Sequence, residues 1–139
     1  MLPADTPSIR FSGLNEYAAQ RVIIVDSICI LLTLYAYAHI AYVGGSFRQG
    51  VHNVLEAAVF GVPVVFGPRY RNSEEPLMLV NQGGGFVVSD IRDLHRTLAN
   101  LLTDEVARST AGERAAQFVR SNVGATEMFL QRLEPYLKG

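Results

Sequence analysis

Short apolar runs alternate with helical or polar segments along the 139 residues of the chain. Five runs have the length and composition of β-strands: residues 9–11, 22–25, 40–43, 62–66 and 86–88. The first two suit buried strands. Helical spacing of apolar residues predicts helices between and after them: a segment from Leu31 to Ala38, then residues 53–60, 76–81, a helix marked by Leu94, Leu98, Leu101 and Leu102, and residues 107–119 and 126–137.

This order predicts an α/β fold. Strands that alternate with helices in a short chain form a parallel sheet with helices on both faces, as in Rossmann-like domains. We expect residues 1–139 to form a single domain. Ligands bind such sheets beyond the carboxyl ends of the strands, so the informative loops follow Val25, Val43 and Phe66.

Composition excludes several classes of function. A formal net charge of -1 gives no support for a nucleic acid partner. The single cysteine, Cys29, is interpreted as a buried thiol, and the three scattered histidines do not indicate a metal site. The apolar stretch 28–47 approaches the length of a membrane span, but His39 interrupts it and two glycines end it, which predicts helix, turn and strand instead. Residues 1–7 lack the pattern of a signal peptide, so we expect a soluble, cytosolic chain.

The first candidate binding element is Gly44-Gly45-Ser46, directly after the third predicted strand. A backbone without side chains can approach a phosphate and offer N–H groups to it. For an isolated Gly-Gly, an ordinary turn between strand and helix is the favoured interpretation.

The second candidate element lies where the following helix should begin. Asn53 and Glu56 have the spacing of a capping box, which needs no ligand, while an anionic group would also fit at the start of a helix. His52 could donate a hydrogen bond to a phosphate or a sugar hydroxyl, although a histidine at this place is commonly just partly buried.

A third group of polar residues follows the fourth predicted strand: Arg69, Arg71, Glu74 and Glu75. A solvated charge cluster is the simplest interpretation. The chain shows neither a Ser-His-Asp order nor a Walker lysine, which argues against hydrolase and P-loop functions.

Taken together, the motifs resemble those of the 3-deoxy-D-manno-octulosonic acid (Kdo) transferases. The order and spacing match over residues 22–130 in four motifs: Asp26-Ser27-x-x-x-Leu31-Leu32-x-Leu34-Tyr35, Ala41-Tyr42-Val43-Gly44-Gly45-Ser46, His52-Asn53-x-Leu55-Glu56 and Phe66-Gly67-Pro68. The segment 50–58, with Ala57 where Pro is commoner in the family, looks most like the branch found in Bacteroides relatives.

The resemblance implies the C-terminal half of a GT-B glycosyltransferase, which binds the donor CMP-Kdo and needs no cofactor or metal. It implies that Gly44, Gly45 and Ser46 approach the donor, that His52 and Asn53 stand beside them, and that Glu56 accepts from ribose hydroxyls. The lipid A precursor and the catalytic carboxylate would belong to an N-terminal half at the cytoplasmic side of the inner membrane. No catalytic residue is therefore expected here, and this chain alone should be inactive.

Departures from the family pattern change these expectations. Cys29 and Ile30 replace a usual Gly and a frequent Glu, and Ser73 replaces a usual Phe. The family's first strand and its Pro-Arg-His segment would precede Met1. That strand would lie between the first and third predicted strands, so we expect rearranged pairing, disorder near the N-terminus, or a partner chain, including a second copy, filling the gap.

Two other functions fit the same residues. The chain could be a GT-B donor domain for another nucleotide sugar, because an anion site at a helix start is general to the fold. It could also be a noncatalytic interaction domain in which Asn53 and Glu56 simply cap a helix.

Overall fold

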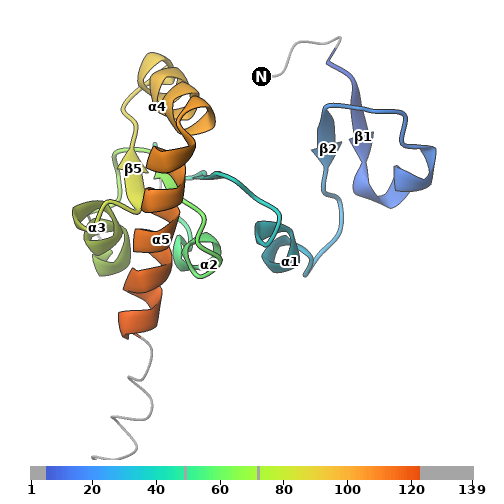
Figure 1. Ribbon diagram of the computed structural model, residues 1–139. Coiled ribbons are helices and arrows are strands. Elements are labelled where there is room, and N and C mark those ends of the chain that lie inside the picture. The colour runs from blue at the N-terminus through green and yellow to red at the C-terminus, as the bar shows by residue number, and fades with distance from the viewer. Residues whose placement is uncertain (1–5, 49, 72, 123–139) are drawn as a thin grey trace, which may run out of the picture. The chain divides into compact units, whose positions relative to one another are not determined.

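The computed structural model describes residues 6–48, 50–71 and 73–122, and it divides the chain into two compact units, Met1–Leu34 and Tyr35–Gly139. The first unit contains β1 (Ser8–Arg10), the 3-10 helix η1 (Phe11–Glu16), β2 (Val22–Ile24) and most of α1 (Leu31–Tyr35). The second contains β3 (Ala41–Val43), α2 (Leu55–Ala58), β4 (Val64–Phe66), α3 (Glu74–Asn81), β5 (Gly85–Val87), α4 (Ile91–Thr103) and α5 (Glu105–Asn122). Figure 1 shows these elements in chain order.

The strands form two parallel sheets. β1 pairs with β2, and β3, β4 and β5 form a second sheet in which β4 is central. Among the described residues no ladder joins β2 to β3. The described strands therefore do not form one continuous sheet.

The three-stranded sheet carries the core because helices cover both of its faces. Val64 and Phe66 of β4 pack on one side in a cluster with α2, α3 and α5, while Val65 packs on the other side with Leu101 of α4. In Figure 1, α3, α4 and α5 surround β5. The alternation of side chains along β4 explains why all three of its residues are buried.

Two glycines allow α5 to approach the turn after α2. Gly61 has φ of +73° and lies in the turn that ends α2, as predicted. A Cβ at Gly112 in α5 would lie 2.1 Å from the carbonyl oxygen of Gly61. This contact requires a residue without a side chain.

The helices differ in length from their predictions. α1 and α2 have five and four residues, shorter than expected, whereas α5 extends to Asn122. Leu102 of the amphipathic α4 is 62% exposed, so its assignment to the apolar face was wrong, while Leu101 is buried. The predicted helix 126–137 lies outside the described residues.

Two predictions about the first unit were wrong. Ile23 and Ile24 of β2 are 47% and 49% exposed rather than buried, since a sheet of two strands covers little apolar surface. Cys29 is exposed and has φ of +69°, because it lies in the bend between β2 and α1. In the described part of the chain, no helix combines the length and apolar character needed to cross a bilayer.

Candidate functional site

The loops that follow β3 and β4 are joined at the carboxyl end of the three-stranded sheet. The side-chain oxygen of Ser46 accepts a hydrogen bond from the backbone N–H of Gly67 at 2.6 Å, and the backbone N–H of Arg69 donates to the carbonyl of Ser46 at 2.9 Å. The guanidinium of Arg69 donates to the carbonyl of Arg48 at 2.5 Å. These bonds fix the backbone of the Gly-Gly-Ser segment.

Ser46 is fully buried, and its hydroxyl oxygen is occupied by Gly67. A buried polar group needs such a partner, because an unpaired one costs free energy. The structure thus gives Ser46 a role in holding two loops together. Its predicted direct contact with a donor remains a prediction.

Gly45 brings the first and second candidate elements into contact. Its φ is +87°, and a Cβ at this position would lie 2.7 Å from two atoms of the His52 imidazole and 2.8 Å from the carbonyl oxygen of Gly50. Gly44 has open space around the corresponding position. Gly45 is therefore the glycine of the pair that the local geometry requires, since an L side chain would be strained and would displace His52.

Asn53 and Glu56 are bonded to each other at the start of α2. The amide oxygen of Asn53 accepts from the backbone N–H of Leu55 at 3.0 Å, and its amide nitrogen donates to the Glu56 carboxylate at 3.1 Å. The prediction of Asn53 as the N-cap was wrong, because α2 begins at Leu55 and its N-cap is Val54. The two expected capping-box residues are still joined, through the Asn53 side chain rather than its backbone N–H. Because α2 has four residues, its dipole is weak.

Glu56 also influences a tyrosine at the start of the second unit. Partial burial, and to a smaller extent the negative charge of Glu56, raise the pKa of Tyr35 above its ordinary value. The shift therefore disfavours the charged phenolate of Tyr35 further than in an ordinary tyrosine.

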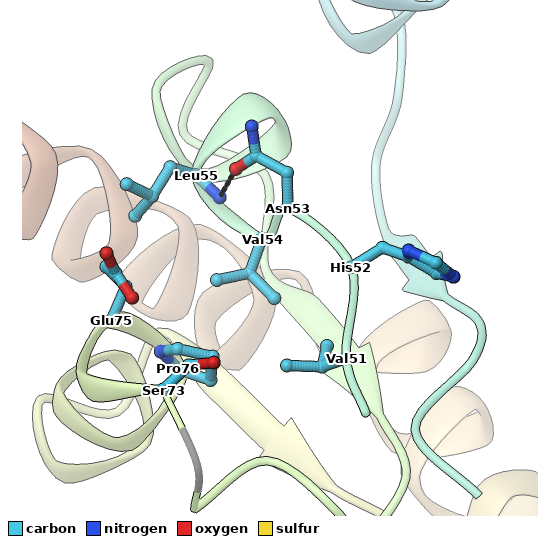
Figure 2. A pocket seen from close by; sticks show the side chains of 8 residues that line it. All are labelled: Val51, His52, Asn53, Val54, Leu55, Ser73, Glu75 and Pro76. Carbon is cyan, nitrogen blue, oxygen red and sulfur yellow. Dashed lines mark hydrogen bonds between the residues drawn. The ribbon is translucent and has the colours of Figure 1, made fainter. Parts of the chain in front are cut away.

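A cavity of about 370 Å³ lies between the start of α2 and the start of α3 (Figure 2). It is lined by Val51, His52, Asn53, Val54, Leu55, Ser73, Glu75 and Pro76. Of the six predicted donor residues, His52 and Asn53 line this cavity, whereas Gly44, Gly45, Ser46 and Glu56 do not. In Figure 2 the imidazole of His52 turns away from Pro76 and Glu75.

The sequence interpretation named Glu75 and Ser73 in the segment after β4 but did not include them among the donor-binding residues, and both line the cavity. It treated the charges after β4 as a solvated cluster, and the structure agrees that they are exposed, while the guanidinium of Arg69 also donates to the carbonyl of Arg48. The only available signal was the position of the segment after a strand that ends at the ligand-binding edge of the sheet.

In the described residues, no group of three His, Cys, Asp or Glu side chains is arranged to hold a metal ion. Asp26, from the first family-like motif, accepts hydrogen bonds from the side chain and backbone of Ser12 at 2.8 and 3.1 Å. These bonds, with the side-chain bond foremost, lower the pKa of the Asp26 carboxyl below its ordinary value. Asp26 therefore organises the first unit.

Comparison with known proteins supports the resemblance of the motifs. No family model matches the chain. The 3-deoxy-D-manno-octulosonic acid transferase of Haemophilus influenzae is 36% identical over 121 residues, covering 85% of this chain and 28% of that protein. The transferases of Rickettsia typhi and Aquifex aeolicus are 31% and 32% identical, covering 84% and 85% of this chain and 26% and 32% of theirs. The chain thus spans about a quarter to a third of the length of these relatives.

A solved structure gives the same result for the fold. The crystal structure of the C-terminal CMP-Kdo binding domain of WaaA from Acinetobacter baumannii has a TM-score of 0.71 and 25% identity with this chain, covering 82% of this chain and 61% of that domain. The predicted α/β class, with the architecture of the C-terminal half of a GT-B protein, is confirmed. The chain is thus related in sequence to the 3-deoxy-D-manno-octulosonic acid transferases and in fold to the C-terminal CMP-Kdo binding domain of WaaA.

Proposed function

We propose that this chain binds the nucleotide sugar CMP-Kdo, as the donor-binding part of a Kdo transferase. The observation that carries the proposal is the cavity at the carboxyl side of the sheet, in a chain similar to a domain described as CMP-Kdo binding. The proposed donor-binding residues are Gly44, Gly45, Ser46, His52, Asn53 and Glu56.

Their roles follow from their geometry. Gly45 leaves room for His52, whose imidazole can donate a hydrogen bond to a phosphate or a sugar hydroxyl. Ser46 acts by fixing the loop through Gly67. Glu56 accepts from Asn53 through one carboxylate oxygen, and its other oxygen can accept from a ligand hydroxyl.

The proposal assigns catalysis to the complete enzyme. A second half would hold the lipid A precursor and the carboxylate base, at the cytoplasmic side of the inner membrane, and would receive Kdo from the donor held here. The isolated chain is then a binding domain without transferase activity.

We also propose that isolated chains self-associate through strand edges. In the described residues, β1 pairs only with β2, and β3 pairs only with β4. Unpaired edges are templates for pairing with another chain. Light scattering of the isolated chain tests this: a concentration-dependent mass above that of one chain supports self-association, and a constant monomer mass contradicts it.

An NMR titration tests donor binding. The amides of residues 44–46 and 52–56 are followed while CMP is added, with UMP as the control for another nucleotide sugar. Selective shifts with CMP support the proposal, and equal shifts with UMP favour a different donor. A folded protein in which neither nucleotide shifts these amides contradicts donor binding and favours a noncatalytic interaction domain.

A further inference from the structure

Glu75 occupies a distinct position among the acidic residues near the proposed site. It lies in the first turn of α3, and it lines the 370 Å³ cavity together with Ser73 and Pro76. Glu56, the carboxylate that the sequence motifs indicate, does not line this cavity. Glu75 is therefore the carboxylate that a ligand in the cavity meets.

Apolar and polar residues share the other walls. Val51, Val54 and Leu55 face α3 across the cavity together with Pro76, and the polar lining residues besides Glu75 are His52, Asn53 and Ser73. Figure 2 places the carboxylate of Glu75 on the side of Leu55. Walls of this mixed kind suit a sugar, which presents both hydroxyl groups and apolar C–H groups, and the volume lies within the range of small-molecule sites, roughly 300 to 1,000 Å³.

The charge of the cavity limits which part of a nucleotide it accepts. Among the described residues of its lining there is no lysine or arginine, and Glu75 is the one acidic residue. An ionised carboxylate only accepts hydrogen bonds, and it repels a phosphate. Its ligand must therefore donate through hydroxyl or amino groups.

We infer that Glu75 is a specificity-determining residue that accepts hydrogen bonds from the ribose hydroxyls of the bound nucleotide, which seats its nucleoside in this cavity and leaves its phosphate outside. The inference rests on the proposed nucleotide-binding function. It assigns the recognition of the ribose in this cavity to a residue in the first turn of α3, whereas Glu56 lies outside the cavity lining.

Binding of CMP and 2′,3′-dideoxy-CMP to the whole chain tests this role. The wild-type protein should bind CMP about tenfold more tightly, since a hydrogen bond to a charged group contributes this order of affinity. Glu75→Ala should weaken CMP binding about tenfold and leave dideoxy-CMP binding unchanged. Glu74→Ala is the matched control, because Glu74 is adjacent, exposed and outside this cavity. It should change neither affinity.

The outcomes separate the inference from the function on which it rests. An equal loss of affinity for both nucleotides in Glu75→Ala, or no loss for either, overturns the role of Glu75 while nucleotide binding stands. Failure of the folded wild-type chain to bind CMP overturns the proposed function, and the ribose contact falls with it. Amide spectra of both variants establish that they remain folded.

Discussion

The side-chain oxygen of Ser46 lies 2.6 Å from the backbone nitrogen of Gly67, and this hydrogen bond joins the loops that follow β3 and β4. Ser46 is fully buried, so no water replaces its hydroxyl when it is removed. A Cβ at Gly67 would lie 2.9 Å from the same oxygen and 2.8 Å from the ring of Phe47. The two residues therefore fit each other closely.

Ser46→Ala should lower the free energy of unfolding by about 1 to 3 kcal/mol, because the buried N–H of Gly67 loses its acceptor. Urea denaturation measures this change, and hydrogen exchange of the Gly67 amide should become faster. Ser73→Ala is the control, because the Ser73 side chain makes no capping bond to α3. An equal loss of stability in both variants would show that the bond to Gly67 has no special role.

Gly45 and Gly44 form a matched pair for the loop after β3. Gly45→Ala should lower the free energy of unfolding by about 1 to 3 kcal/mol, since the new Cβ meets His52 and Gly50 at a positive φ. Gly44→Ala should change it by less than about 0.5 kcal/mol, because its Cβ meets open space. Thermal or urea unfolding compares the two. Similar stabilities would contradict the contact between Gly45 and His52.

The contact between Gly112 and Gly61 should be the least tolerant of substitution. Gly112→Ala places a Cβ 2.1 Å from the carbonyl oxygen of Gly61, so α5 must move from the turn after α2. We expect a loss of about 3 kcal/mol, near the upper end of overpacking effects. Gly13→Ala, with no atoms near its Cβ, is the control. Normal unfolding midpoints for Gly112→Ala would mean that α5 does not pack here.

The carboxyl of Asp26 should titrate at a lower pH than an ordinary aspartate. Its lowered pKa stabilises the folded chain above the unfolded pKa of about 3.9, and this contribution is lost as the pH falls through the folded value. Ser12→Ala removes the leading cause and should raise the pKa of Asp26 toward the ordinary value. NMR titration of the side-chain carbon measures it. Ser27→Ala is the control and should leave the pKa of Asp26 unchanged, because the Ser27 hydroxyl makes no bond to Asp26. An unchanged pKa in Ser12→Ala would contradict the role of Ser12.

Much of the fold could be predicted because apolar runs and glycines determine it locally. Residues 62–66 predicted β4, and Gly61 predicted the end of α2. The exposure of β2 and of Cys29 could not be predicted in this way, because the first depends on what packs against the two-stranded sheet and the second on the bend between β2 and α1. The lengths of α1 and α2 depend likewise on packing rather than on local spacing.

The arrangement of the candidate residues could be predicted only in part. The motifs identified Gly45, His52 and Glu56, and the structure brings Gly45 against His52. The sequence could not show that Ser46 points into the protein or that Glu75 reaches the cavity. Both facts depend on the segment after β4, which begins about twenty residues after Ser46 in the sequence.

The most direct test of the account is the affinity of the chain for CMP and UMP, measured by calorimetry in the wild type and in Glu56→Gln. The account predicts tighter binding of CMP than of UMP, and a loss of CMP affinity in a Glu56→Gln variant that remains folded. Equal affinities for the two nucleotides, or no binding of either by the folded wild-type chain, would contradict the assignment of a CMP-Kdo donor site.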